Sequence, residues 1–116
     1  MRQKYGNFSQ SQIDSTKKDI RKQIIFLLSI ADPKLKEQYQ HIDVKAAFQS
    51  LLDELSGLNE LLFQPPELVI VMSLLEAALK EYNSTPFDFG RYRKLILDAG
   101  AKVNAIREVD DESNSH

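Results

Sequence analysis

The sequence predicts an all-α protein, an antiparallel four-helix bundle, from three observations. Apolar side chains return every three or four residues in four segments, which is the period of one helix face. Prolines and short polar stretches separate these segments. The 116 residues contain four glycines and four prolines, which argues against a loop-rich β-sandwich. Four helices with one apolar face each bury those faces by packing against one another.

The chain is expected to form one domain with a polar segment at each end, because its length suits a single core. Residues 1–12 are polar and predict a flexible N-terminus. The bundle is expected to span residues 13–107. The last segment, EVDDESNSH at 108–116, is acidic and predicts a disordered tail.

The first helix is predicted to begin after a capping residue at Asp14 or Ser15. Asp32-Pro33 ends it, because the residue before a proline disfavours the helical conformation. Pro33–Gln40 is then expected to form a short helical turn. The apolar face of the first helix is predicted to contain Ile13, Ile20, Ile24, Leu27 and Ala31.

The second helix shows the cleanest periodicity in the chain. Asp43 precedes it and is expected to cap the free amides of its first turn. Gly57 lies inside this helix, where it either costs up to about 1 kcal/mol relative to alanine or marks a break near Ser56. The apolar face is predicted to contain Val44, Phe48, Leu51, Leu55, Leu58 and Leu62.

The third helix is predicted to begin at Pro66, since proline suits the first helical position. Apolar residues surround nearly its whole circumference, so it is either enclosed by the other helices or carries a dimer contact. Asp88 is expected to cap the fourth helix. The apolar face of that helix is predicted to contain Tyr92, Leu95, Ile96, Ala99, Val103 and Ile106.

The residue types that most enzymes need are scarce in this chain. It has no cysteine, which excludes disulfides, thiol nucleophiles and Cys-ligated metals. Its two histidines are His41 and His116. The carboxylates of Asp53, Glu54 and Glu60 lie off the leucine stripe and read as a solvated face. We therefore predict no catalytic residue, no metal site and no cofactor. A hydrolase with scattered carboxylate ligands and an RNA-binding subunit are the lesser alternatives.

Charge is distributed unevenly, although the net charge is only −2. Residues 46–90 hold one basic and seven acidic side chains, whereas residues 1–45 hold nine basic and five acidic ones. This acidic middle disfavours nucleic acid as a partner. Two groups of basic residues stand out in the sequence. They are either solvated helix faces or a docking surface, whose partner would be an acidic protein or an anionic membrane. The candidate partner-binding group is Arg91, Tyr92, Arg93 and Lys94, and the secondary basic stripe is Lys17, Lys18, Arg21 and Lys22.

No segment reads as a membrane anchor or a secretion signal. The longest apolar stretches, Ile24–Ala31 and Leu68–Leu75, are far shorter than the about 20 residues of a spanning helix. The N-terminus is polar and lacks an apolar signal-peptide core. These observations predict a cytoplasmic protein without a transmembrane segment.

The order of features resembles the enterocin A-type, pediocin-like bacteriocin immunity proteins. From residue 64 onward the matching residues are Pro65-Pro66-Glu67-Leu68-Val69, Leu74-Leu75, Leu79, Phe89, Tyr92 and Leu95-Ile96. Upstream, the matching residues are Gln23-Ile24-Ile25, Asp32-Pro33-Lys34 and the leucine-striped second helix. The resemblance covers about 90 residues and consists of apolar spacing and prolines, without a chemical motif.

The resemblance implies a cytosolic antiparallel four-helix bundle without catalytic activity. Such proteins protect the cell that produces a pore-forming peptide, acting from inside at the membrane receptor that the peptide targets. Their last helix and C-terminal segment, here Phe89–Ile106 and the tail, carry specificity. The implied partner is therefore a membrane receptor or a bacteriocin–receptor complex. The alternative function is a generic helical adaptor or a small subunit of a larger complex, with a homodimer left open.

Overall fold

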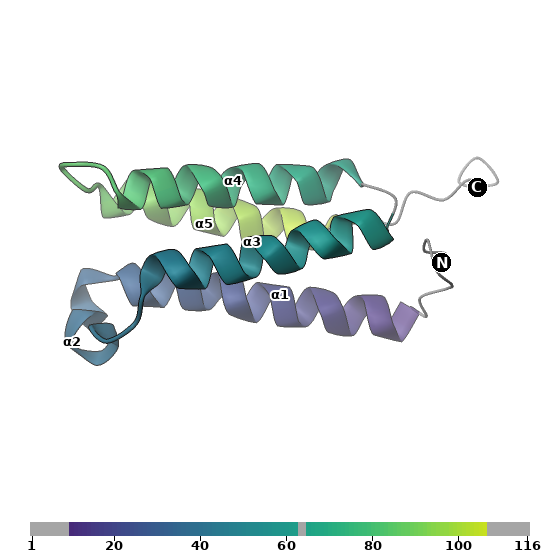
Figure 1. The fold of residues 1–116 in the computed structure, drawn as a ribbon, viewed down its shortest axis with the longest axis horizontal. Helices are drawn as coiled ribbons and strands as arrows, with labels where there is room; N and C mark the ends of the chain where they lie inside the picture. The colour runs from purple at the N-terminus through teal and green to yellow at the C-terminus, as the bar shows by residue number, and fades with distance from the viewer. Residues whose placement is uncertain (1–9, 63–64, 107–116) are drawn as a thin grey trace.

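The computed structural model describes residues 10–62 and 65–106, and in this part of the chain all regular structure is helical, with no strand. The all-α class predicted from the sequence is confirmed. The four long helices lie along one axis, which gives the molecule principal extents of 49 × 21 × 19 Å (Figure 1). The helices are α1 (Gln10–Ala31), the 3-10 turn η1 (Pro33–Leu35), α2 (Lys36–Tyr39), α3 (Val44–Leu61), α4 (Pro66–Tyr82) and α5 (Phe89–Val103).

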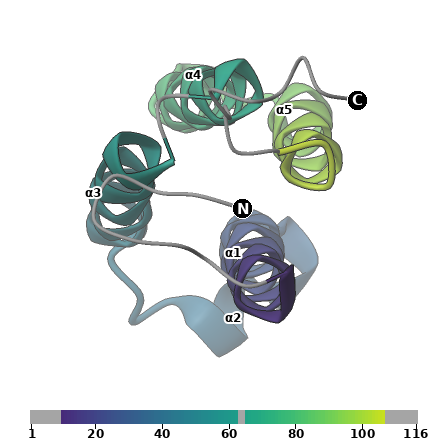
Figure 2. The ribbon, with the colours of Figure 1, turned by 90° about the vertical axis from the view of Figure 1, so that its right-hand side faces the viewer.

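The long helices form a ring in the order α1, α3, α4, α5 when viewed along the axis (Figure 2). Each long helix packs chiefly against its two neighbours in this ring, and α5 closes it by packing against both α4 and α1. The short helix α2 lies at one end and contacts α1. Segments at opposite ends of the chain therefore lie side by side.

The first helix begins earlier than predicted. It starts at Gln10, so Asp14 and Ser15 lie inside the helix and neither caps it. Residues 10–12, which we expected to be flexible, belong to its first turn. Residues 1–9 of the predicted flexible segment lie outside the described residues, as does the predicted tail at 108–116.

The predicted starts of the other three long helices are confirmed, whereas the last helix ends at Val103 and does not extend to Ile106 as predicted. Asp43 Oδ1 accepts a hydrogen bond from the amide of Ala46 at 3.1 Å, and Asp88 Oδ1 accepts one from the amide of Arg91 at 3.2 Å. Both carboxylates thus satisfy amides that a helix start leaves unpaired. Pro66 takes the first position of α4. The predicted turn after Asp32-Pro33 is present as η1 and α2.

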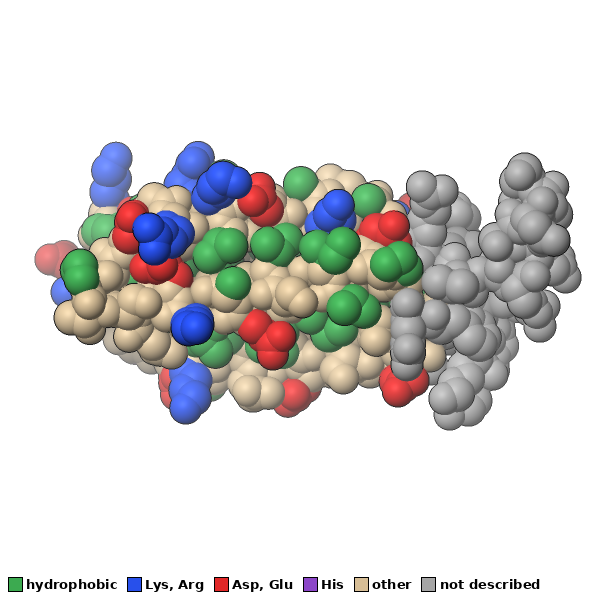
Figure 3. All heavy atoms as spheres, turned by 90° about the horizontal axis from the view of Figure 1, so that it is seen from above, with side chains coloured by type: hydrophobic (Ala, Val, Ile, Leu, Met, Phe, Trp, Pro, Cys, Tyr) green, Lys and Arg blue, Asp and Glu red, His purple; other side chains and the backbone are tan. Residues whose placement is uncertain are grey.

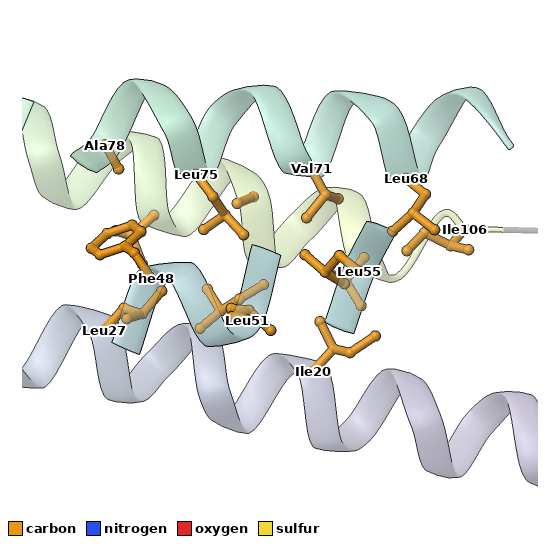
Figure 4. Close-up of a cluster of buried hydrophobic side chains, with 14 of the residues drawn as sticks. Ile20, Leu27, Phe48, Leu51, Leu55, Leu68, Val71, Leu75, Ala78 and Ile106 are labelled. Carbon is orange, nitrogen blue, oxygen red and sulfur yellow. The ribbon is translucent and has the colours of Figure 1, made fainter. Parts of the chain in front are cut away.

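The core is a continuous column of apolar side chains between the four long helices (Figure 4). Leu27, Phe48, Leu55 and Leu75 are each at most 1% exposed. Figure 4 shows Leu68, Val71, Leu75 and Ala78 of α4 pointing toward α1 and α3. Ile106 lies beyond the end of α5 and is nevertheless buried, at 3% exposure.

The structure decides whether α3 breaks at Gly57 and whether α4 is enclosed by the other helices. The helix α3 continues through Gly57, so no break occurs there. The helix α4 is not enclosed, because Val69 and Ile70 are 44% and 42% exposed. Nearly all-round apolarity therefore produces one buried face and one exposed apolar face on α4.

Candidate functional site

Tyr92 lies in the core, so its predicted place among exposed partner contacts is wrong. Its side chain is fully buried, and its hydroxyl donates a hydrogen bond of 2.6 Å to the backbone oxygen of Leu27 on α1. The spacing of Tyr92 to Ile96 and Ala99 had already placed it on the apolar face of α5. That position decides its burial, whereas its charged chain neighbours point elsewhere.

Aromatic rings surround Tyr92 at this end of the molecule. The ring of Phe89 stacks on it, with centroids 6.2 Å apart, while Phe87 meets it edge-on at 5.6 Å. Phe48 and Tyr82 contact it from α3 and α4. Burial, with a smaller contribution from Tyr82, raises the pKa of the Tyr92 hydroxyl well above its ordinary range. The ring cluster holds the start of α5 against the other helices.

Arg91 helps to close the loop between α4 and α5. Its guanidinium lies 3.5 Å from the carboxylate of Glu81, whose side chain is only 10% exposed. The same carboxylate accepts a hydrogen bond from the amide of Asp88 at 3.3 Å. Glu81 thus holds both the loop and the first turn of α5. The Arg91 side chain remains 70% exposed and available at the surface.

Arg93 and Lys94 are exposed but differ in their surroundings. Lys94 pairs with Asp98 one turn later on α5, at 3.2 Å. Arg93 makes no ion pair with any described residue. Arg91 and Lys94 flank α4, since Arg91 bonds Glu81 and Asp98 lines the groove between α4 and α5. The four predicted contacts therefore do not form one surface.

The secondary basic stripe lies beside the end of α5. Lys17 Nζ donates to the backbone oxygen of Asn104 at 3.3 Å, and Arg21 donates to the side-chain oxygen of Asn104 at 2.5 Å. Cations at this position stabilise the carbonyl end of a helix. Lys18 and Lys22 are exposed on α1.

α4 and α5 share an exposed apolar surface, here called the α4–α5 face, which the sequence analysis offered only as one of two alternatives for the third helix and without naming its residues. Figure 3 shows hydrophobic side chains gathered along the middle of this side of the molecule. A groove of about 380 Å³ runs between the two helices. Asp98 and Lys102 also line this groove, and Lys94 pairs with Asp98. The apolar members of the α4–α5 face are Ile70, Leu74, Ala77, Ala101 and Ala105.

The signal for this face was present in the sequence. Ile70, Leu74 and Ala77 recur at spacings of four and three, on a stripe of α4 that adjoins the buried stripe of Leu68 and Leu75. The sequence left open which of the two stripes is covered, because that depends on the positions of the neighbouring helices.

Groups suited to metal binding do not assemble among the described residues. In residues 10–62 and 65–106, no three side chains of His, Asp or Glu gather closely enough to hold a metal ion. His41 is exposed in the turn between α2 and α3. None of the helices that the structure describes combines the length and apolarity needed to cross a bilayer.

Comparisons of the chain with protein-family models, with curated proteins and with solved structures gave no match.

Proposed function

We propose that this chain is a non-enzymatic binding protein, an antiparallel four-helix bundle whose α4–α5 face docks a protein partner. The contacts that support the bundle run between opposite helix ends. The start of α1 bonds the end of α5 through Lys17 and Asn104, while Leu27 near the end of α1 bonds Tyr92 near the start of α5. The C-terminal end of α4 likewise contacts the start of α5 through the ion pair of Glu81 and Arg91.

The exposed apolar surface of α4 and α5 carries this proposal. Its apolar side chains, with Ile70 the most exposed large one, lie beside Asp98 and Lys102, which also line the groove, and beside Lys94, which pairs with Asp98. Apolar side chains bordered by charged ones are a usual composition of a protein–protein interface. A helix face that contacts only water usually carries polar side chains, whereas α4 exposes Ile70 on this face.

The surface is also rigid enough to serve as a docking site. Leu68, Val71 and Leu75 anchor α4 in the core from its other side. Glu81 and the aromatic cluster fix the loop that joins it to α5. A partner that binds here would lose little free energy to ordering of this chain.

A matched pair of variants tests the proposal. Ile70→Ser removes an apolar side chain from the α4–α5 face, whereas Ile25→Ser makes the same change at an exposed position on α1. Tagged chains carrying either change are expressed in the host, and co-purified proteins are compared with those of the wild type. We expect Ile70→Ser to lower the recovery of a specific partner by about tenfold, the loss that about 1.4 kcal/mol gives, while Ile25→Ser retains it.

Equal recovery by both variants would contradict docking through α4 and α5. Circular dichroism of each variant establishes that helicity is unchanged, since both side chains are largely exposed.

The narrower proposal is a cytosolic bacteriocin immunity protein that acts at a membrane receptor or a bacteriocin–receptor complex. It is supported by the resemblance in helix order, with Pro66 opening α4 and Phe89 opening α5. Expression in a strain sensitive to a peptide encoded beside the gene is expected to confer resistance. Undiminished killing by that peptide would argue for the alternative, a helical adaptor or small subunit of a larger complex.

Self-association is the second outcome that the α4–α5 face allows. An isologous dimer would cover the apolar stripes of two copies with one another. Light scattering during size exclusion separates the two cases. A stable dimer that Ile70→Ser dissociates would assign the face to a second copy.

A further inference from the structure

We propose that a different side of the molecule, formed by α1 and α5, docks onto a bilayer surface that contains anionic phospholipids. This inference goes beyond the proposed function, because it concerns other residues and another class of ligand. The α1–α5 face is defined by Lys17, Lys18, Arg21, Lys22 and Ile25 of α1 with Arg93 and Leu97 of α5.

Contacts between α1 and α5 determine which residues share this face. Arg21 bonds Asn104, and a Cβ at Gly100 would lie 3.8 Å from Ile24. Residues 93, 97, 100 and 104 recur at spacings of four, three and four, so they form the row of α5 beside α1. Residues 17, 21 and 25 form the corresponding row of α1. Arg93 and Leu97 therefore lie on the same side of the molecule as Arg21 and Ile25.

No carboxylate of the described residues forms an ion pair with the cations of this face. Lys17 and Arg21 donate to Asn104, which is uncharged. Lys18, Lys22 and Arg93 have no ion pair within residues 10–62 and 65–106. Asp14 precedes this stripe on α1 and offsets part of the charge. The structure thus brings two basic segments of the sequence onto one helix pair.

Two exposed apolar side chains lie between the basic groups. Ile25 is 51% exposed and Leu97 is 38% exposed. Ile25 follows Arg21 and Lys22 by one turn of α1, and Leu97 follows Arg93 by one turn of α5. Apolar side chains bordered by Lys and Arg are typical of helices that lie in the plane of a membrane interface.

The spread of the cations favours a lipid surface over an acidic peptide. Lys18 lies in the first half of α1 and Lys22 near its middle, whereas Arg93 lies near the start of α5, beside the C-terminal part of α1. An extended sheet of anionic headgroups meets both groups at once, and each adds to the attraction.

The opposite side of the ring strengthens this orientation. The helices α3 and α4 lie across the ring from α1 and α5 (Figure 2), and residues 46–90, which contain most of them, hold seven acidic and one basic side chain. This charge separation turns the α1–α5 face toward an anionic surface and the acidic helices away from it.

Vesicle flotation tests the inference directly. Large unilamellar vesicles of phosphatidylcholine alone are compared with vesicles that contain equal parts of phosphatidylcholine and phosphatidylglycerol. We expect the wild-type chain to float with the anionic vesicles at low ionic strength, to remain behind with the neutral ones, and to dissociate as salt is added.

Charge-reversal variants identify the face. Lys22→Glu with Arg93→Glu is expected to weaken binding to anionic vesicles by at least about tenfold. The matched control is Lys45→Glu with Lys80→Glu, which makes the same change in net charge at exposed positions of α3 and α4. The control is expected to retain most of the binding. Circular dichroism establishes that both variants stay helical.

Three results would overturn the inference. The first is equal binding of the wild type to neutral and anionic vesicles, or to neither. The second is an equal loss in both charge-reversal variants. Binding to polyglutamate without binding to vesicles would assign the face to an acidic protein and overturn it as well.

The same two serine variants distinguish a failure of membrane docking from a failure of partner docking. Ile70→Ser should leave vesicle binding intact while it lowers recovery of the protein partner. Ile25→Ser should do the opposite, because Ile25 lies on the α1–α5 face.

Discussion

The hydroxyl of Tyr92 donates a 2.6 Å hydrogen bond to the backbone oxygen of Leu27, which joins the first and last long helices of the chain. Both residues are buried, at 0% and 1% exposure. The two residues are 65 positions apart in the sequence, and their hydrogen bond is buried. A buried hydrogen bond of this kind sets the position of α5 relative to α1.

Replacing Tyr92 with Phe removes this hydrogen bond and keeps the ring. We expect the free energy of unfolding to fall by about 1 kcal/mol, the usual net value of a buried neutral hydrogen bond. Urea denaturation followed by circular dichroism measures it. Tyr39→Phe, a half-buried tyrosine at the end of α2, is the control and should change stability by less. Equal stabilities of Tyr92→Phe and wild type would show that the bond contributes nothing.

Stability should fall at alkaline pH because of the same hydroxyl. Burial raises the pKa of Tyr92 above its ordinary value of about 10, so the folded state keeps a proton that the unfolded state loses. The contribution is complete below about pH 10 and is lost as the pH rises further. Urea titrations at increasing pH should show a shallower decline for Tyr92→Phe than for wild type. Identical declines would contradict the assignment.

Glu81 should be needed for stability although it is an acidic residue. Glu81→Ala leaves the amide of Asp88 without its acceptor and removes the partner of Arg91. We expect a loss of about 1 kcal/mol, because a part-buried amide and a largely exposed guanidinium lose their common partner. Glu76→Ala, at an exposed position of the same helix, should stay within about 0.5 kcal/mol of wild type. Thermal unfolding compares the two, and similar losses would refute a specific role for Glu81.

Gly57→Ala is expected to stabilise the protein. Gly57 lies inside α3, and a Cβ at this position would meet nothing within 4 Å. Alanine in a helix interior is favoured over glycine by up to about 1 kcal/mol. A higher midpoint of thermal unfolding measures this gain. A lower midpoint would mean that α3 needs the freedom of glycine at this position.

Local chemistry made most of the fold predictable. Asp43 and Asp88 are capping residues with free helix amides after them, and Pro66 starts a helix because its ring fits the first position. Each of these features depends on a few adjacent residues. The periodic apolar stripes likewise identify Leu55 and Ile96 as core residues.

The predicted exposure of Tyr92 and the predicted start of α1 were wrong. The first relied on the neighbours of Tyr92 in the sequence and not on its position on the helix, and the second concerned a segment without an apolar pattern. Tyr92 stands between two arginines, yet its place on the buried face of α5 decides its exposure. The start of α1 at Gln10 carries no apolar period, so its extent could not be predicted.

The surfaces required tertiary information. Nothing in the sequence says that Arg21 lies beside Asn104, or which stripe of α4 its neighbours leave open. Both follow from how four helices close into a ring, which depends on contacts between distant segments.

Site-specific photo-crosslinking tests the central claim most directly. A photoreactive residue replaces Ile70 on the α4–α5 face or, as control, Ser50 on the exposed side of α3. The two chains are irradiated inside the host cell. Docking through α4 and α5 predicts one discrete crosslinked protein from position 70 and none from position 50. The same products from both positions, or none from position 70, would contradict it.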